Sequence, residues 1–503
     1  MTTTPAAAEI RYASPSGRWV LLAAVLGSSV AFLDATVVNV ALPAIGEDLG
    51  AGLDGLQWTV TAYLLTLAAF ILVGGSLGDR LGRRRVFVVG VVWFALASAL
   101  CGLAPGAAEL AGARALQGVG AALLTPGSLA LIEASFAPGD RGQAIGAWSG
   151  LTGIAAAVGP FAGGWLIDAA SWRLIFLINL PLAALTVAVA VRHVPESKDP
   201  TAAPGLDVGG AVLAIVGLAG CTYALIEAPA AGASPAVVVT ALAGLLALGG
   251  FVAVEARSSH PMLPLDIFAS PRFTSANVVT FVVYAALGGA FFVLVVQLQQ
   301  VLDYSALEAG AATLPVTVVM LALSSRAGRL AQRVGPRGPM TAGPIVMAVG
   351  LAMMTTIDVG SPYWADVFPA VVVFALGLAL TVAPLTATVL AAADPRHAGV
   401  ASGVNNAVAR VAGLLAVAAL PALAGLGEGD YRQPAEFAQG FRIAVSLAAA
   451  LSAGGGVLAW LTIRPDHRLS RRLPEEHHCA LDGPPLRPAQ HCLPDSPRAE
   501  ERS

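Results

Sequence analysis

The sequence contains little charge. Only 12% of its 503 residues are Asp, Glu, Lys or Arg, whereas 56% are hydrophobic. A typical soluble domain has about 25% charged residues. A soluble protein of this length needs far more charge to cover its surface, so the composition argues strongly against a soluble enzyme.

Several other features are scarce. Lysine occurs once, as Lys198, and the preference for Arg suggests a GC-rich bacterial genome. Of the four cysteines, Cys101 and Cys221 lie in apolar stretches and Cys479 and Cys492 in a polar tail, which implies no disulfide framework. A net charge of −3 gives no sign of nucleic-acid binding. No GxxxxGK[ST] loop occurs, so we expect no bound nucleotide.

Long apolar runs are abundant. A membrane-spanning helix needs about 20 mostly apolar residues, and helices are the default because unpaired backbone groups are too costly in lipid. The sequence predicts an all-α polytopic membrane protein with fourteen spans, near 19–42, 57–78, 86–104, 108–131, 144–168, 173–193, 208–227, 235–255, 274–300, 309–325, 339–357, 364–391, 399–424 and 440–462.

Positive charge alternates between the loops. Arg residues gather before the first span and in every second loop, for example at Arg80, Arg141 and Arg396, whereas the other loops are mostly acidic. Loops rich in Arg and Lys stay in the cytoplasm. The pattern therefore places both termini in the cytoplasm of a bacterial plasma membrane, in agreement with an even number of spans.

Two of the Arg-rich loops resemble each other. Residues 75–84 and 328–337 share Gly, Leu, Arg, Gly and Arg in register. A repeat of helical halves is typical of transporters that rock around a central site. The predicted organisation is a cytoplasmic N-terminus (1–18), a six-helix bundle (19–194), a linker (195–206), an inserted helix pair (207–256), a cytoplasmic loop (257–273), a second six-helix bundle (274–462) and a disordered cytoplasmic tail (463–503).

Five segments carry a resemblance to a known family. The segment 75–84 resembles motif A of the major facilitator superfamily, 110–120 resembles motif B, and 153–164 resembles motif C, the antiporter motif. The segments 33–43 and 172–181 are similar to signatures of its 14-helix drug:proton antiporters. The resemblance extends from about residue 19 to residue 462, and implies the major facilitator fold with two inserted helices.

Two of these motifs have expected roles. Motif A is expected to form a cytoplasmic gate, in which Asp79 caps the next element or pairs with an Arg such as Arg141; its residues are Gly75, Gly78, Asp79, Arg80, Gly82 and Arg83. The alternative is that the basic run Arg83–Arg85 only anchors the orientation of the chain. The resemblance implies that motif C forms a packed hinge, with residues Gly153, Gly159, Pro160, Gly163 and Gly164. Its alternative is generic close packing of small residues in lipid. The second copy of motif A has Gln332 where the first has Asp79, so a full charge lock is not expected there.

Three ionisable residues lie deep in predicted spans, where such residues are functional candidates by default. Asp34 is roughly 22 Å from the cytoplasmic end of the first span, and Arg114 roughly 9 Å from the outer end of the fourth. In a core of about 30 Å these depths nearly coincide. Burial favours a neutral carboxyl group and a nearby cation favours the charged form. We therefore expect Asp34 to bind the coupled proton and Arg114 to tune it, the alternative being a static ion pair.

The remaining candidates are polar residues of a central cavity. Arg410 could contact substrate or serve as a structural hydrogen-bonding centre. Single polar groups in spans often bond to a neighbouring helix instead. The candidates are Asn39, Gln117, Tyr284, Gln297, Asn405 and Arg410.

The tail from Arg464 is polar and Pro-rich. It contains His477-His478-Cys479 and His491-Cys492, but their spacing matches no structural zinc site. We expect no metal and no cofactor, with the proton gradient as the energy source.

These observations predict a monomeric secondary transporter that exports amphipathic organic compounds in exchange for protons by alternating access. One alternative is an importer or uniporter of a small metabolite on the same fold. A second is a dedicated exporter of one natural product that confers self-resistance. A membrane enzyme or sensor would need a catalytic cluster in the spans, and the sequence has no paired carboxylates or His/Cys set there.

Overall fold

The computed structural model describes most of the chain, namely residues 10–198, 207–258, 261–392, 398–427 and 433–463. Every long element in these ranges is a helix. The predicted disorder of the tail, and its His/Cys pairs, lie outside the described residues. The first half contains α1 (Pro15–Leu49), α2 (Leu53–Leu81), α3 (Arg83–Gly102), α4 (Ala107–Ser135), α5 (Pro138–Ala169), α6 (Leu174–Leu177) and α7 (Asn179–His193).

Two inserted helices and a second series follow. The inserted helices are α8 (Val208–Ala231) and α9 (Pro235–Glu255). The second series contains α10 (Pro271–Gln300), α11 (Ala306–Val334), α12 (Arg337–Met354), α13 (Phe368–Ala391), α14 (Ala398–Leu423) and α15 (Pro434–Thr462), with a short 3₁₀ turn before α10 (Leu265–Ala269) and a π turn before α13 (Tyr363–Val367).

Local sequence explains where several helices begin and end. The Ser14 side chain accepts from the Gly17 amide at the start of α1, and Gly50 ends that helix in the left-handed conformation, which glycine adopts without strain. Ser305 and Glu308 form a reciprocal capping box at the start of α11.

The described chain contains fourteen long helical segments, with α6 and α7 counted as one, which agrees with the predicted number. Thirteen of them are long and apolar enough to cross a membrane. The other is α12, which has only 18 residues and begins at Arg337. The tenth span is longer than the predicted 309–325, because α11 continues past its apolar run to Val334.

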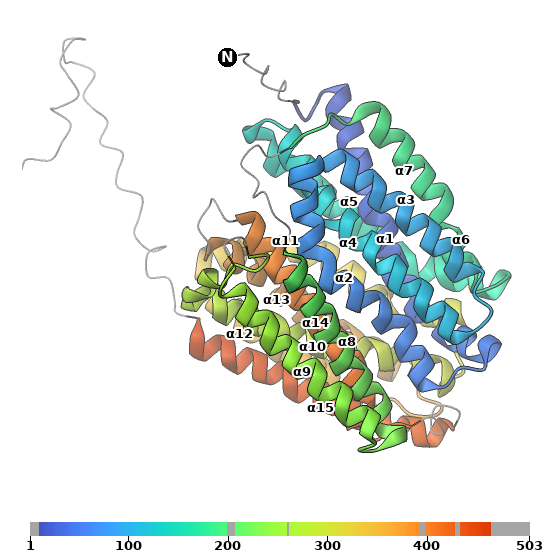
Figure 1. The fold of residues 1–503 in the computed structure, drawn as a ribbon. Helices are drawn as coiled ribbons and strands as arrows, with labels where there is room; N and C mark the ends of the chain where they lie inside the picture. The colour runs from blue at the N-terminus through green and yellow to red at the C-terminus, as the bar shows by residue number, and fades with distance from the viewer. Residues whose placement is uncertain (1–9, 199–206, 259–260, 393–397, 428–432, 464–503) are drawn as a thin grey trace, which may run out of the picture. The chain divides into compact units, whose positions relative to one another are not determined.

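The helices form two sets that pack mainly among themselves (Figure 1). In the N-terminal set (α1–α7), α4 packs against α2 and α3, and α1 against α5. In the C-terminal set (α10–α15), α13 packs against α11 and α12, and α10 against α14 and α15. The two sets meet where α5 packs against α11 and α2 against α14, and α8 contacts both α2 and α14.

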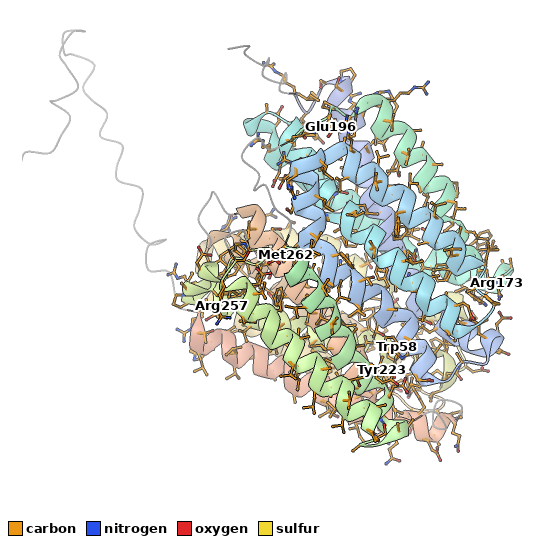
Figure 2. The ribbon with its side chains drawn as sticks, in the orientation of Figure 1. Trp58, Arg173, Glu196, Tyr223, Arg257 and Met262 are labelled. Atoms are coloured by element: carbon orange, nitrogen blue, oxygen red, sulfur yellow. The ribbon has the colours of Figure 1, made fainter. Side chains whose placement is uncertain are left out.

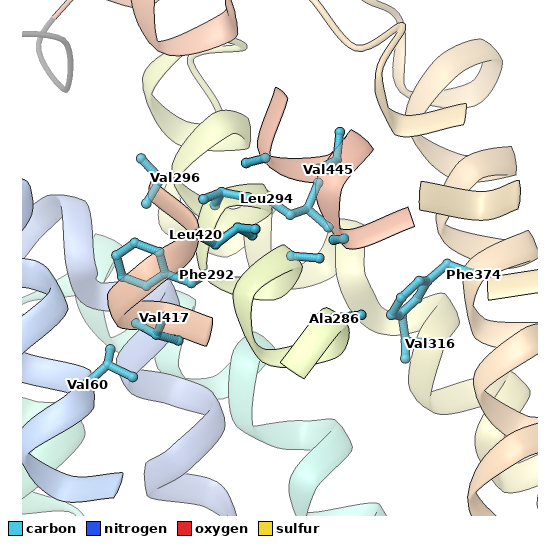
Figure 3. Packing of buried hydrophobic residues seen from close by; sticks show 14 of the residues in the cluster. Val60, Ala286, Phe292, Leu294, Val296, Val316, Phe374, Val417, Leu420 and Val445 are labelled. Atoms are coloured by element: carbon cyan, nitrogen blue, oxygen red, sulfur yellow. The ribbon is translucent and has the colours of Figure 1, made fainter. Parts of the chain in front are cut away.

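The apolar core crosses the boundary between the sets. Val60 of α2 belongs to the same buried cluster as Phe292 of α10 and Val417 of α14 (Figure 3). Large apolar side chains such as Leu246 of α9 are instead exposed, as expected for surfaces that face lipid.

The two ends of the helix assembly differ in charge. We call the end with the N-terminus of α1 and the run Arg83–Arg85 the basic end, and the end with the α1–α2 connection the acidic end. Figure 2 helps to locate the two ends. Glu196, which follows α7, lies at the basic end, and Arg173, which precedes α6, lies at the acidic end. Arg173 forms an ion pair with Asp48 at the acidic end.

Candidate functional site

A buried ion pair lies between α1 and α4. Arg114 Nη1 is 2.5 Å from Asp34 Oδ2, and the two side chains are only 1% and 0% exposed. Each residue lies well inside its helix, and the antiparallel course of α1 and α4 brings the two depths together. Removing one partner of such a pair leaves an uncompensated charge away from water, which costs about 3–5 kcal/mol.

Further donors surround the carboxylate. Gln117 Nε2 donates to Asp34 Oδ1 at 2.7 Å, and Asn179 Nδ2 donates to the same oxygen at 3.2 Å. The hydroxyl of Ser98 accepts from both amides. Each oxygen of Asp34 therefore has at least one hydrogen-bond donor.

The guanidinium group of Arg114 is equally well enclosed. Its Nε donates to the Thr59 carbonyl at 3.0 Å, and its Nη1 also donates to Gln117 Oε1 at 2.6 Å. Its central carbon lies 4.3 Å from the centroid of the Tyr63 ring, within cation–π range. Arg114 is thus joined to α1, α2 and α4, and a change at Asp34 would be felt by all three helices.

A cavity of about 290 Å³ lies beside this network, between the two sets of helices. Arg114 and Tyr63 line it, whereas Asp34 lies behind them. The opposite wall includes Phe291 of α10 and Arg410 of α14. Among the described residues, Arg410 has no hydrogen-bond or ion-pair partner, so its guanidinium group is available to acceptor groups in the cavity.

The structure distributes the predicted cavity residues differently. Asn39 and Arg410 line this cavity, whereas Tyr284 is not among its lining residues. Gln117 belongs to the Asp34 network. The side chain of Gln297 donates to the Ile357 carbonyl, and that of Asn405 accepts from Thr280. Hydropathy gives the depth of a polar residue, but its direction depends on helix rotation, which packing sets.

Sequence reasoning missed two members of the Asp34 network. Ser98 and Asn179 are both fully buried, and each contacts an amide or carboxylate of the network. Asn179 is a single amide in an apolar run and belongs to the segment 172–181 that carries the family resemblance. Ser98 had no comparable signal, since isolated serines are common in spans.

The glycines of α5 divide into two groups. Toward the acidic end, a side chain at Gly163 would collide with Val37 of α1, and one at Gly164 with the start of α11. Toward the basic end, a Cβ at Gly142, Gly146 or Gly150 would have no described atom within 4 Å. Motif C is therefore tightly packed, while the three glycines of the other half of α5 face open space.

The remaining motif C residues follow this division. Gly159 lies against Thr36 of α1, and the Pro160 carbonyl lies against Gly310 of α11. Gly153 lies between the packed and the open glycines, and a Cβ at this position would be 3.4 Å from Leu321.

Hydrogen bonds also join the two sets near the acidic end. Asp168, at the end of α5, accepts from the amides of Ala306 and Leu307 at the start of α11. A carboxylate at a helix N-terminus is stabilising. Gln57 of α2 donates to the Val417 carbonyl, and Gln299 of α10 donates to the Val40 carbonyl. These contacts connect α1, α2 and α5 to the C-terminal set.

Motif A forms a compact turn at the basic end. Asp79 pairs with Arg83 at 2.7 Å, whereas Arg141, the partner considered from the sequence, donates to the Phe136 carbonyl. Gly82 has φ 119°, a conformation that favours glycine. The carboxylate of Glu196, which follows α7, accepts from the Arg84 amide. Glu196 is a further residue that the motif pattern did not reveal.

The other motif A residues have looser surroundings. A Cβ at Gly75 would be 3.9 Å from Pro126, and one at Gly78 would be 4.0 Å from Arg83 Cα. A side chain at either position would make only ordinary van der Waals contacts, so the packing here does not require glycine. Arg80 lies in the last turn of α2 and also makes an interaction.

Comparison with known proteins gives consistent results. The family model for the Major Facilitator Superfamily matches residues 24–417. The chain is 35% identical to the puromycin resistance protein of Streptomyces alboniger, over 89% of this chain and 92% of that protein. It is 36% identical to the multidrug resistance protein Stp of Mycobacterium tuberculosis, over 80% and 74% of the two chains.

Solved structures share the fold at low sequence identity. A bacterial homologue of the human lysosomal transporter Spinster, in an inward-facing and unoccupied conformation, matches with a TM-score of 0.63 and 17% identity over 90% of this chain and 97% of that one. A peptide transporter bound to sulfate matches with a TM-score of 0.66 and 15% identity over 92% and 98%. The family model and the resistance-protein relatives show that the chain belongs to the major facilitator superfamily, within its 14-helix family of drug-resistance exporters.

Proposed function

We propose that this protein exports amphipathic organic compounds across the bacterial plasma membrane in exchange for protons, with both termini in the cytoplasm. The observation that carries the proposal is the buried Asp34–Arg114 pair beside a cavity between the two sets of helices. An intramembrane carboxylate is the usual proton carrier in transporters. No cofactor is needed for such exchange.

Coupling would operate through the charge of Asp34. In the described state the carboxylate pairs with Arg114 and accepts hydrogen bonds from Gln117 and Asn179. A proton on Asp34 would cancel its attraction for Arg114 and release a guanidinium group that already lines the cavity. Since the bonding of Arg114 reaches α1, α2 and α4, protonation and the packing of these helices are linked.

Alternating access would use the two halves of α5. The acidic end is joined by motif C and Asp168, while the glycines toward the basic end face open space. With the basic end in the cytoplasm, this arrangement corresponds to an inward-facing state. Outward opening would part the motif C contacts and bring Gly146 and Gly150 close to another helix. Motif A would hold the basic end closed in that outward state.

The cavity suggests the kind of compound carried. Its walls are mostly apolar, and its polar points are Asn39, Tyr63, Arg114 and Arg410, the last of which has no partner among the described residues. This combination suits an aromatic or aliphatic body with oxygen acceptors. It offers no free carboxylate to an organic cation while Asp34 is paired with Arg114.

Two alternatives remain on the same fold. Export rather than import of a metabolite is supported by the relatives, which are resistance proteins. Export of a single natural product has support from the puromycin resistance relative, and broad export from the multidrug resistance relative. A panel that includes puromycin, ethidium and other antibiotics separates these two substrate ranges.

The test uses an efflux-deficient host that expresses the chain. We expect resistance to at least one compound of the panel, and lower cellular accumulation that an uncoupler reverses. Asp34→Asn should abolish this energised efflux because the residue can no longer exchange a proton. Asp48→Asn is the matched control, since Asp48 is also a carboxylate of α1 but pairs with Arg173 at the acidic end.

Substrate exchange separates a coupling defect from misfolding. Reconstituted Asp34→Asn protein should still exchange labelled compound across a vesicle membrane without a pH gradient. Full energised efflux by Asp34→Asn would contradict the proposal. Loss of exchange in Asp34→Asn, with normal exchange in Asp34→Glu, would indicate that the variant has lost its structure.

A further inference from the structure

A second cavity lies between α1 and α5 at the basic end. The two helices are joined midway along α1, where Trp148 Nε1 donates to the Ser28 hydroxyl at 3.0 Å. A cavity of about 680 Å³ extends from this level toward the basic end. It is lined by residues of α1 between Arg18 and Val25, by residues of α5 between Asp140 and Leu151, and by residues 11–13, which precede α1.

The segment before α1 is fixed in place. The Ile10 amide donates to the Ser135 carbonyl, and the Ile10 carbonyl accepts from Ala137, so the segment is bridged to the end of α4. The Tyr12 amide donates to Asp140 Oδ2 at 2.9 Å. A side chain at Gly17 would crowd the Arg11 carbonyl and the Phe136 ring. The cavity therefore has a preformed wall.

The lining of this cavity is amphipathic. Arg11 and Arg18 are exposed and belong to the lining nearest the N-terminus. Asp140 and Gln143 also line the cavity, and one oxygen of Asp140 accepts from the Tyr12 amide. The lining then becomes apolar; its side chains are Leu21, Leu22, Val25 and Leu151.

The apolar part of the cavity is long enough and open enough to hold part of a lipid acyl chain. From Arg18 to Val25 is roughly 10 Å along the helix axis. Leu22 and Leu151 are 37% and 46% exposed, so this part is open at the side rather than sealed. Basic pockets between spans on the cytoplasmic side bind anionic lipid headgroups.

We propose that this cavity binds an anionic glycerophospholipid of the cytoplasmic leaflet, with the phosphate at Arg11 and Arg18 and an acyl chain along Leu22, Val25 and Leu151. The proposal rests on the orientation proposed above but not on proton coupling. Charge complementarity favours an anionic over a zwitterionic headgroup, because the two arginines exceed the single Asp140. The apolar wall favours a lipid over a free phosphate ester.

Native mass spectrometry of the full purified chain tests this proposal. Phosphatidylglycerol, phosphatidylethanolamine and glycerol 3-phosphate are titrated separately, and dissociation constants are read from the bound fractions. We expect phosphatidylglycerol to bind most tightly. Replacing both arginines, as Arg11→Gln/Arg18→Gln, should weaken its binding about 30-fold, from about five-fold for each cation near a membrane surface.

Two further variants keep the test decisive. Arg192→Gln removes an exposed arginine of α7 that does not line the cavity and should leave binding unchanged. Leu151→Trp keeps both arginines but fills the apolar part, and should weaken the lipid without affecting the thermal unfolding temperature.

The opposite outcomes would overturn the proposal. Equal binding of phosphatidylethanolamine, or equal losses in Arg192→Gln and the double variant, would mean that the cavity does not select the anionic headgroup. Binding of glycerol 3-phosphate as tightly as the lipid would mean that the apolar wall has no role. Displacement of lipid by an exported compound, with the same sensitivity to Leu151→Trp, would identify the cavity as an entry site for substrate instead.

Discussion

At the scale of residues, the decisive feature is how completely the Asp34 carboxylate is enclosed. Arg114, Gln117 and Asn179 all donate to it, and the side chain is out of contact with solvent. A single proton therefore changes several hydrogen bonds at once. Such a group is suited to coupling, since its charge and the packing of its neighbours cannot change independently.

Replacing Asn179 should weaken the hydrogen bonding around the Asp34 carboxylate. Asn179→Ala removes one of its donors, and a hydrogen bond to a charged group contributes about 1.5 kcal/mol or more. We therefore expect energised efflux to fall in Asn179→Ala, while exchange of labelled compound without a pH gradient is retained. Accumulation in cells and exchange in vesicles measure the two activities.

The control is Thr186→Val, on the same helix. Thr186 is buried and its hydroxyl bonds only to the Leu182 carbonyl of its own helix. An equal loss of energised efflux in both variants, or no loss in Asn179→Ala, would contradict a direct role of Asn179 at the carboxylate.

At the scale of elements, α5 combines a packed half, whose glycines touch other helices, with an open half, whose glycines face open space. Motif C glycines at the acidic end are in close contact with α1 and α11, whereas Gly142, Gly146 and Gly150 face open space. The same helix thus presents two surfaces of small residues, and in the proposed cycle only one of them is closed at a time.

The packed half should be sensitive to added volume. Gly163→Ala places a methyl group against Val37, and overpacking of this kind typically costs about 1–3 kcal/mol. Gly146→Ala adds the same methyl group into open space and should leave the thermal unfolding temperature unchanged or slightly raised. Thermal unfolding of the two purified variants measures the difference, and similar temperatures would contradict the described packing.

Added side-chain volume in the open half of α5 should impair transport. A leucine at Gly146 is accommodated in the described state but would obstruct closure of the basic end. We expect Gly146→Leu to keep its thermal stability and to lose most of its efflux. Gly454→Leu is the control, because Gly454 of α15 is also unobstructed and lies outside the contact between the sets. Wild-type efflux by Gly146→Leu would show that this surface does not close.

The sequence predicted the positions of the helices better than the directions in which their side chains point. Apolar runs located the fourteen spans, and matched depths led to the Asp34–Arg114 pair. Hydropathy did not reveal the break between α6 and α7. It also did not reveal the full length of α11, because this helix continues beyond its apolar run into a charged end. Gln297 and Asn405 were assigned to the cavity but bond to Ile357 and Thr280, since the rotation of a helix depends on its neighbours.

At the scale of the whole molecule, the N-terminal set contains the Asp34 network and the C-terminal set contributes Arg410 to the opposite side of the cavity. The inserted helix α8 packs against both α2 and α14. Leu218 of α8 shares a small buried cluster with Leu65 of α2 and Leu414 of α14. Movement of one set relative to the other must therefore be accommodated by the insert.

The most direct test of the proposed exchange is proton release from purified protein when a compound binds. In weakly buffered solution with a pH indicator, addition of an exported compound identified in the panel should release protons from the wild type and from Asp48→Asn, but not from Asp34→Asn, although all three bind it. Equal release from Asp34→Asn and the wild type would contradict the assignment of Asp34 as the proton-binding group.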